Sequence, residues 1–238
     1  MFVTLGIMTT IQAQLQAVRA RMAAACQAAG RDVGSVRLLA VSKTFGAEAV
    51  RAAHAAGQTA FGENYIQEAV KKITFLADLP LEWHCIGPIQ SNKTRLVAEH
   101  FAWAQTIDRL KIAQRLDEQR PPHLAPLQVC IQVNVDGGPS KSGIAPSEVP
   151  ALARAVAALP RLRLRGLMCI PEPAPDFESA RAVFARARAL FDELNRDGLS
   201  LDTLSMGMTA DLEAAIAAGS TMVRVGTAIF GTRDYDKV

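Results

Sequence analysis

The sequence is poor in cysteine, in aromatic residues and in net charge. Its four cysteines form no Cys-x-x-Cys pair, and a chain of 238 residues is too large to need a disulfide framework, so we expect reduced, buried thiols and no metal site. Lys and Arg outnumber Asp and Glu only by 26 to 23, and aromatic residues make up 5% of the chain. Because no basic stripe with interleaved aromatics occurs, we expect no nucleic-acid partner. The pair Lys71-Lys72 is interpreted as a solvated helix face.

Long apolar runs and linkers are also absent. No segment is long enough to span a bilayer, and residues 1–8 lack the basic start and apolar stretch of a signal peptide. We therefore expect a cytoplasmic protein without a membrane partner. The chain has no low-complexity linker, which predicts one domain over residues 1–238, with residues 1–8 as a frayed extension.

What the chain does contain is a regular alternation of two patterns. Short apolar segments, typical of buried parallel strands, occupy residues 37–42, 59–62, 83–86, 102–106, 127–134, 164–170, 203–206 and 222–226. Helical patterns lie between them, at 47–57, 66–78, 92–100, 110–119, 147–159, 177–196 and 210–217. A further helix is expected over 9–30, with one apolar face made by Ile11, Leu15, Val18, Met22 and Cys26.

Eight strands that alternate with helices imply a parallel sheet. The count and the chain length of 238 residues favour a single (β/α)8 TIM-type barrel with an extra N-terminal helix. An open doubly wound sheet is the alternative. In either fold, function is built from the residues that follow the carboxyl ends of the strands.

Lys43 is the first such residue, directly after the apolar run 38–41. A lysine at the mouth of an apolar barrel is expected to be partly desolvated, which lowers its pKa and frees the amine for attack on a carbonyl. The alternative is a surface lysine whose stem passes the end of the strand.

Two patches of small and hydroxyl-bearing residues follow the last two predicted strands. Ser205, Met206 and Gly207 follow the seventh, and Gly226 and Thr227 follow the eighth. Loops seven and eight of such barrels often form a phosphate site from exposed backbone N–H groups. The alternative is that the glycines only form turns. A lysine opposite a phosphate site is what a phosphorylated aldehyde requires.

The chain resembles the YggS/PROSC family of pyridoxal 5′-phosphate (PLP) homeostasis proteins over residues 38–231. The segments that carry the resemblance are AVSKT at 40–44, FGEN at 61–64, WHCIG at 83–87, QSNK at 90–93, KSG at 141–143, LSMGM at 204–208 with Asp211, and VRVGT at 223–227. The resemblance implies PLP fold type III, the barrel of the alanine racemase N-terminal domain. It further implies a PLP carrier or regulator, monomeric, whose partners would be PLP-dependent enzymes that receive the cofactor.

The resemblance also implies roles for single residues. Lys43 would hold PLP as a Schiff base. The phosphate would be held by Ser205, Gly207, Gly226 and Thr227, with Met206 able to touch the cofactor. Asn64 and His84 would lie near the ring, and Arg224 against its pyridine nitrogen. Family members commonly carry a second lysine two residues after the first, and Phe45 stands there in this chain.

An arginine at the pyridine nitrogen has chemical consequences. Arginine stays cationic and cannot give the ring a proton, so the cofactor would be a weak electron sink. A racemase of the alanine-racemase type is the alternative to a non-catalytic carrier. It needs a second base, for which the chain offers only Tyr65 and Tyr235, and the usual extra β-domain is missing. A third hypothesis is a cofactor-free aldolase that uses Lys43.

Overall fold

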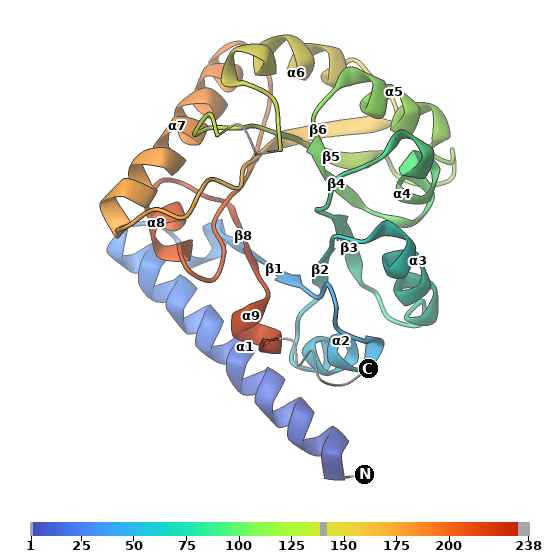
Figure 1. The fold of residues 1–238 in the computed structure, drawn as a ribbon, viewed down its shortest axis with the longest axis vertical. Helices are drawn as coiled ribbons and strands as arrows, with labels where there is room; N and C mark the ends of the chain where they lie inside the picture. The colour runs from blue at the N-terminus through green and yellow to red at the C-terminus, as the bar shows by residue number, and fades with distance from the viewer. Residues whose placement is uncertain (1, 139–141, 233–238) are drawn as a thin grey trace.

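Eight parallel strands form a closed barrel in the computed structural model, which describes residues 2–138 and 142–232 (Figure 1). The strands are β1 (Arg37–Val41), β2 (Ala60–Glu63), β3 (Glu82–Cys85), β4 (Trp103–Ile107), β5 (Leu127–Gln132), β6 (Leu162–Met168), β7 (Thr203–Ser205) and β8 (Met222–Val225). Each pairs with its neighbour in sequence, and β8 closes the barrel on β1. The predicted barrel is confirmed, and the open sheet is wrong.

The helices lie outside the barrel, one after each strand (Figure 1). They are α2 (Ala47–Ala55), α3 (Ile66–Phe75), α4 (Thr94–His100), α5 (Leu110–Gln119), α6 (Val149–Ala157), α7 (Phe177–Arg196) and α8 (Leu212–Ala217). Short 3-10 turns η1 (Val33–Ser35), η2 (Ser91–Lys93) and η3 (Pro146–Glu148) precede β1, α4 and α6. Helix α9 (Thr227–Phe230) was not predicted, because four residues are too few to show a helical period.

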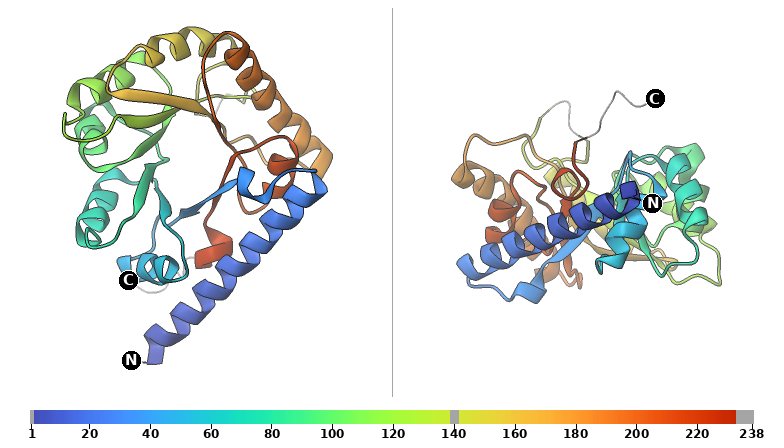
Figure 2. Two further views of the ribbon diagram at one scale, coloured as in Figure 1. Left: turned by 180° about the vertical axis from the view of Figure 1, so that it is seen from behind. Right: turned by 90° about the horizontal axis from the view of Figure 1, so that it is seen from below.

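Helix α1 (Phe2–Ala28) covers the part of the barrel formed by α2, α8 and α9. Its predicted apolar face is buried, and Gly30 ends it at a φ of +65°. The helix begins at Phe2, so the expected frayed extension over residues 1–8 is helical in its described part. No proline interrupts residues 2–10, and a Thr-Thr pair is tolerated within a helix. Figure 2 shows the amino end of α1 projecting beyond the barrel.

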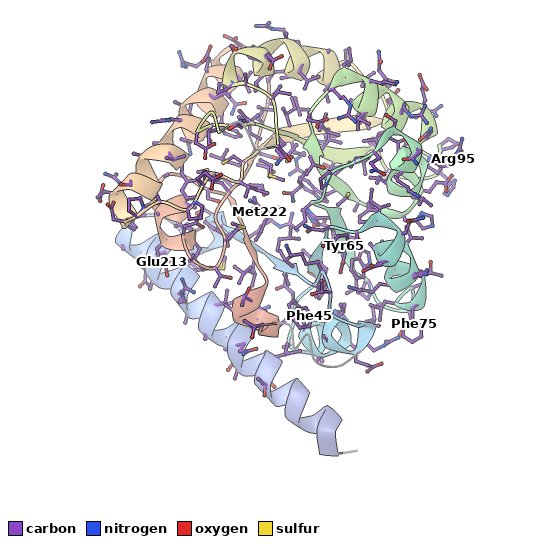
Figure 3. All side chains as sticks on the ribbon, viewed as in Figure 1. Phe45, Tyr65, Phe75, Arg95, Glu213 and Met222 are labelled. Carbon is purple, nitrogen blue, oxygen red and sulfur yellow. The ribbon has the colours of Figure 1, made fainter. Side chains whose placement is uncertain are left out.

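The barrel interior differs chemically from the layer beneath the helices. That outer layer is one continuous apolar cluster. The interior also holds apolar groups, such as Leu39 and Met222, the latter labelled on β8 in Figure 3. Beside them, however, lie fully or almost fully buried polar side chains of His84, Gln105, Ser205 and Arg224. Buried polar groups must find partners, so the interior is expected to contain a hydrogen-bond network.

The four cysteines are buried and unpaired, as predicted. Burial raises the pKa of Cys85, Cys130 and Cys169 to about 12, which keeps these thiols protonated. Within the described part of the chain, no helix combines the length and the apolar character that crossing a bilayer requires.

Candidate cofactor site at the barrel rim

Lys43 lies in a tight turn at the carboxyl end of β1. The N–H of Phe45 donates to the carbonyl of Ser42 at 3.1 Å, and Thr44 closes the turn at a φ of +70°. The left-handed region is costly for a β-branched residue, so the turn is strained. It carries the Lys43 side chain out of the strand, where it is exposed. The desolvation expected at Lys43 is therefore absent, because the strand ends before the lysine.

A buried ion pair holds the backbone of this turn in place. Lys72 of α3 lies 2.6 Å from the Glu63 carboxylate, with side-chain exposures of 11% and 2%. The Ser42 hydroxyl also donates to Glu63 at 2.6 Å, and the Lys72 ammonium donates to the Ser42 carbonyl at 3.0 Å. The interpretation of Lys72 as a solvated residue is wrong, because α3 turns it toward the end of β2. The backbone next to Lys43 is thus anchored by charge.

Gly226 brings the end of β8 against the end of β1. A Cβ atom at this position would lie 3.1 Å from the Val41 carbonyl oxygen, so glycine permits the close approach. Helix α9 follows, and its first hydrogen bonds run from Ile229 and Phe230 N–H to the Gly226 carbonyl. The N–H groups of Thr227 and Ala228 come before the first helical hydrogen bond and therefore have no acceptor within α9. Thr227 is exposed.

An aromatic contact joins the same two loops. The rings of Phe45 and Phe230 stack with centroids 5.2 Å apart, and Figure 3 shows Phe45 beside α9. Phe45, two residues after Lys43, thus packs against the end of α9.

The end of β7 is more enclosed than predicted. Ser205 and Met206 are completely buried. Gly207 has a φ of +96°, and a Cβ atom there would lie 2.5 Å from that of Ala215 on α8. Its carbonyl accepts from the Arg224 N–H at 2.9 Å. Gly207 thus permits the tight passage from β7 into the next loop, while the Ser205 hydroxyl points into the barrel.

Arg224 is 3% exposed and is held at both terminal nitrogens. Nη1 donates to the Ser205 hydroxyl at 2.7 Å, and Nη2 donates to the Cys169 carbonyl at 2.9 Å. Burial lowers the pKa of the guanidinium from its ordinary value. Among residues 2–138 and 142–232, no carboxylate forms an ion pair with it. A guanidinium that has no ion-pair partner among the described residues is therefore fixed inside the barrel.

The network continues from Ser205 to the opposite end of the barrel. The Ser205 hydroxyl donates to Gln105 Oε1 at 2.6 Å, and Gln105 Nε2 bonds His84 Nδ1 at 2.9 Å. His84 Nε2 meets the Glu82 carboxylate at 2.8 Å, and Arg37 donates to the same carboxylate at 2.7 Å. We call this set, from Arg224 to Arg37, the buried chain after its buried members Arg224, Ser205, Gln105 and His84; the Glu82 and Arg37 side chains at its end are 36% and 49% exposed.

Sequence reasoning placed His84 near a ring, and the structure places it in the middle of the buried chain. Its imidazole is completely buried and stacks on Trp103 at 4.9 Å. Burial lowers the pKa of His84 despite the neighbouring Glu82, so the ring is neutral at neutral pH. Gln105 was missed, because a glutamine within a continuous apolar strand carries no pattern that distinguishes the inner face.

Glu82 gives the buried chain a pH dependence. Burial alone would raise the pKa of Glu82, but hydrogen bonds from His84 and Arg37 outweigh it and lower this pKa from 4.5 to about 2. A lowered pKa in the folded chain contributes stability above pH 4.5, which is lost as the pH falls towards 2. We expect the unfolding free energy, from urea titrations, to fall across this window more steeply than in Glu82→Gln. Equal slopes would contradict the pairing.

Asn64 follows β2 and faces a cavity of about 530 Å³. Tyr65, Gln90 and Lys93 also line this cavity. The Asn64 Oδ1 atom is buried and has no hydrogen-bond partner within the described residues. Because an unpaired buried acceptor is costly, this atom indicates a missing donor. Tyr235, which the sequence offered as a second base, and Lys141 of the KSG segment lie outside the described residues.

The structure thus places the predicted site residues other than Met206 and Gly207 in two groups. Lys43 follows β1, Gly226 and Thr227 follow its neighbour β8, and Asn64 lies on the loop after β2. His84, Ser205 and Arg224 belong to the buried chain.

Comparisons with known proteins agree with this architecture. Residues 13–234 match the family described as alanine racemase, N-terminal domain. The pyridoxal phosphate homeostasis protein of Pseudomonas aeruginosa is 64% identical over 228 residues, which cover 96% of this chain and 98% of that protein. The protein of the same name from Escherichia coli is 54% identical over 233 residues, covering 97% and 100%.

Solved structures agree as well. PipY of Synechococcus elongatus, solved with PLP bound, superposes with a TM-score of 0.81 at 39% identity, covering 93% of this chain and all of that one. An alanine racemase of Clostridium difficile has a TM-score of 0.71 at 14% identity over 86% of this chain and 54% of its own, which supports the fold alone. The chain therefore belongs to the family of pyridoxal phosphate homeostasis proteins and has the alanine racemase N-terminal barrel.

Proposed function

We propose that this protein binds PLP as a Schiff base on Lys43 and acts as a carrier or regulator of the cofactor. One observation carries the proposal: Gly226 lies against Val41, so the first N–H groups of α9, those of Thr227 and Ala228, follow a strand that pairs with the strand ending just before Lys43. An amine and an anion-binding backbone on adjacent loops are what a phosphorylated aldehyde needs. The PLP-bound relative at 39% identity supports the same ligand.

The remaining residues suit the cofactor in different ways. The unpaired Asn64 Oδ1 can accept a bond from a ligand. The phosphate would be held by Thr227 and by the backbone of Gly207 and Gly226, since the Ser205 hydroxyl is engaged by Arg224 and Gln105. Bound PLP would supply an electrophilic aldehyde and an electron-withdrawing ring. Arg224, which cannot transfer a proton to the pyridine nitrogen, would keep that withdrawal weak.

The small number of candidate bases at the rim supports a carrier role over racemisation. Racemisation needs a base on each face of the substrate, and Tyr65 is the one tyrosine that the described residues contain. It is 54% exposed, in a cavity open to solvent. Because Lys43 is exposed, a cofactor bound to it could be released into solvent or passed to PLP-dependent enzymes. We extend the proposal to a monomer that delivers PLP to such enzymes.

The deciding experiment is an absorbance spectrum of the purified protein before and after borohydride, followed by peptide mapping. We expect a yellow protein whose colour is lost on reduction, with the pyridoxyl group fixed on Lys43. Chiral chromatography of an amino-acid panel should show no turnover. A protein that takes up no PLP would overturn the proposal, and clear racemisation would replace the carrier role with catalysis.

A further inference from the structure

We propose that Gln105 is a positioning residue that fixes the orientation of Arg224 through Ser205. The inference rests on the proposed function, because Arg224 is the residue assigned to the pyridine nitrogen. Gln105 lies in β4 and is completely buried. Its amide is the only link in the buried chain between Ser205 and His84.

The direction of every hydrogen bond in the buried chain follows from the neutral state of His84. Neutral His84 donates from Nε2 to the Glu82 carboxylate, so its Nδ1 must accept. Gln105 must therefore turn its NH2 group toward His84 and its oxygen toward Ser205. A reversed amide would set the Gln105 oxygen against the Nδ1 lone pair. The Gln105 NH2 group has a further acceptor in the Met222 sulfur at 3.2 Å.

This direction decides what Ser205 can offer to Arg224. The Ser205 proton is committed to Gln105 Oε1 at 2.6 Å, so a lone pair faces Arg224 Nη1 at 2.7 Å. With Nη2 tied to the Cys169 carbonyl, the guanidinium plane is held at two corners. Without the Gln105 acceptor, the Ser205 hydroxyl loses the bond that fixes its rotamer, so its hydrogen bond to Nη1 no longer holds that corner of the guanidinium in one orientation.

Gln105→Met tests the inference, because methionine fills a similar volume but neither donates to His84 nor accepts from Ser205. In the apo protein, we expect the ¹⁵N shifts of His84 to change, as Nδ1 loses its donor. In the loaded protein, we expect PLP release to accelerate about tenfold, the effect of one buried hydrogen bond. Borohydride should still label Lys43. The pH at the midpoint of the change in the absorbance band of bound PLP should also shift.

A matched control and a double variant separate positioning from general loosening. Gln58 is also a buried glutamine, and its amide donates to the Leu38 and Ala60 carbonyls and not to the buried chain. Gln58→Met should lower stability and leave PLP release unchanged. Ser205→Ala combined with Gln105→Met should release PLP no faster than Ser205→Ala alone, since Gln105 acts through Ser205.

Each failure has a distinct signature. Unchanged PLP release and absorbance in Gln105→Met, with altered His84 shifts, would overturn the positioning role while the proposed function stands. Unchanged His84 shifts in the apo protein would overturn the buried chain itself. A wild-type protein without PLP would refute the proposed function, and the positioning role with it.

Discussion

Lys43→Ala is expected to abolish borohydride-fixable PLP completely and to change the unfolding free energy by less than about 0.5 kcal/mol. The side chain is exposed, and the described residues provide it with no hydrogen bond or ion pair. Nothing in the barrel therefore depends on its amine. The measurements are mass spectrometry after reduction and urea unfolding monitored by circular dichroism.

Lys71→Ala is the matched control, because Lys71 is an exposed lysine of α3 that the site does not use. This variant should bind and retain PLP like the wild type. Covalent label persisting in Lys43→Ala would move the Schiff base to another lysine. Loss of folding in that variant would show that Lys43 has a structural role instead.

Lys72→Met is expected to destabilise the fold by about 3–5 kcal/mol, the cost of leaving a buried charge without its partner. Glu63 is 2% exposed and would keep only the Ser42 hydroxyl as a donor among the bonds that hold it now. The loss would also free the Ser42 carbonyl, so the turn that carries Lys43 would loosen. Urea unfolding measures the first effect, and the PLP release rate measures the second.

The double variant Glu63→Gln with Lys72→Met isolates the charge. Removing both charges should restore a large part of the stability that Lys72→Met loses, because a neutral amide is less costly to bury than a carboxylate. If the single variant loses less than about 1 kcal/mol, water must reach Glu63, and the pair behaves like a surface contact.

The barrel was predictable because its signal is periodic and repeated. Each strand lies within two residues of its predicted range, since apolar segments alternate with helical patterns throughout. Helix α9 escaped prediction because it is shorter than a helical period can reveal. The predicted start at residue 9 is too late, because Thr9 and Thr10 are residue types that commonly cap a helix and nothing else in the sequence contradicts a start there.

The candidate site was predictable in its position and less so in its contacts. Strand ends identify Lys43, Gly226 and Thr227, because parallel strands all end at one rim. Which side of a strand faces inward cannot be read from a continuous apolar run, so Gln105 stayed hidden. The exposure of Lys43 depends on the left-handed backbone of Thr44, which no local preference of threonine favours.

The stacked rings of Phe45 and Phe230 couple two segments that are almost two hundred residues apart in the chain. Separating the two rings would expose both aromatic faces to solvent, at a free-energy cost of roughly 1 kcal/mol or more. The segment after β1 and helix α9 are therefore expected to move together. A ligand bound between these two segments would contact a rigid pair, and a displacement of one segment would displace the other.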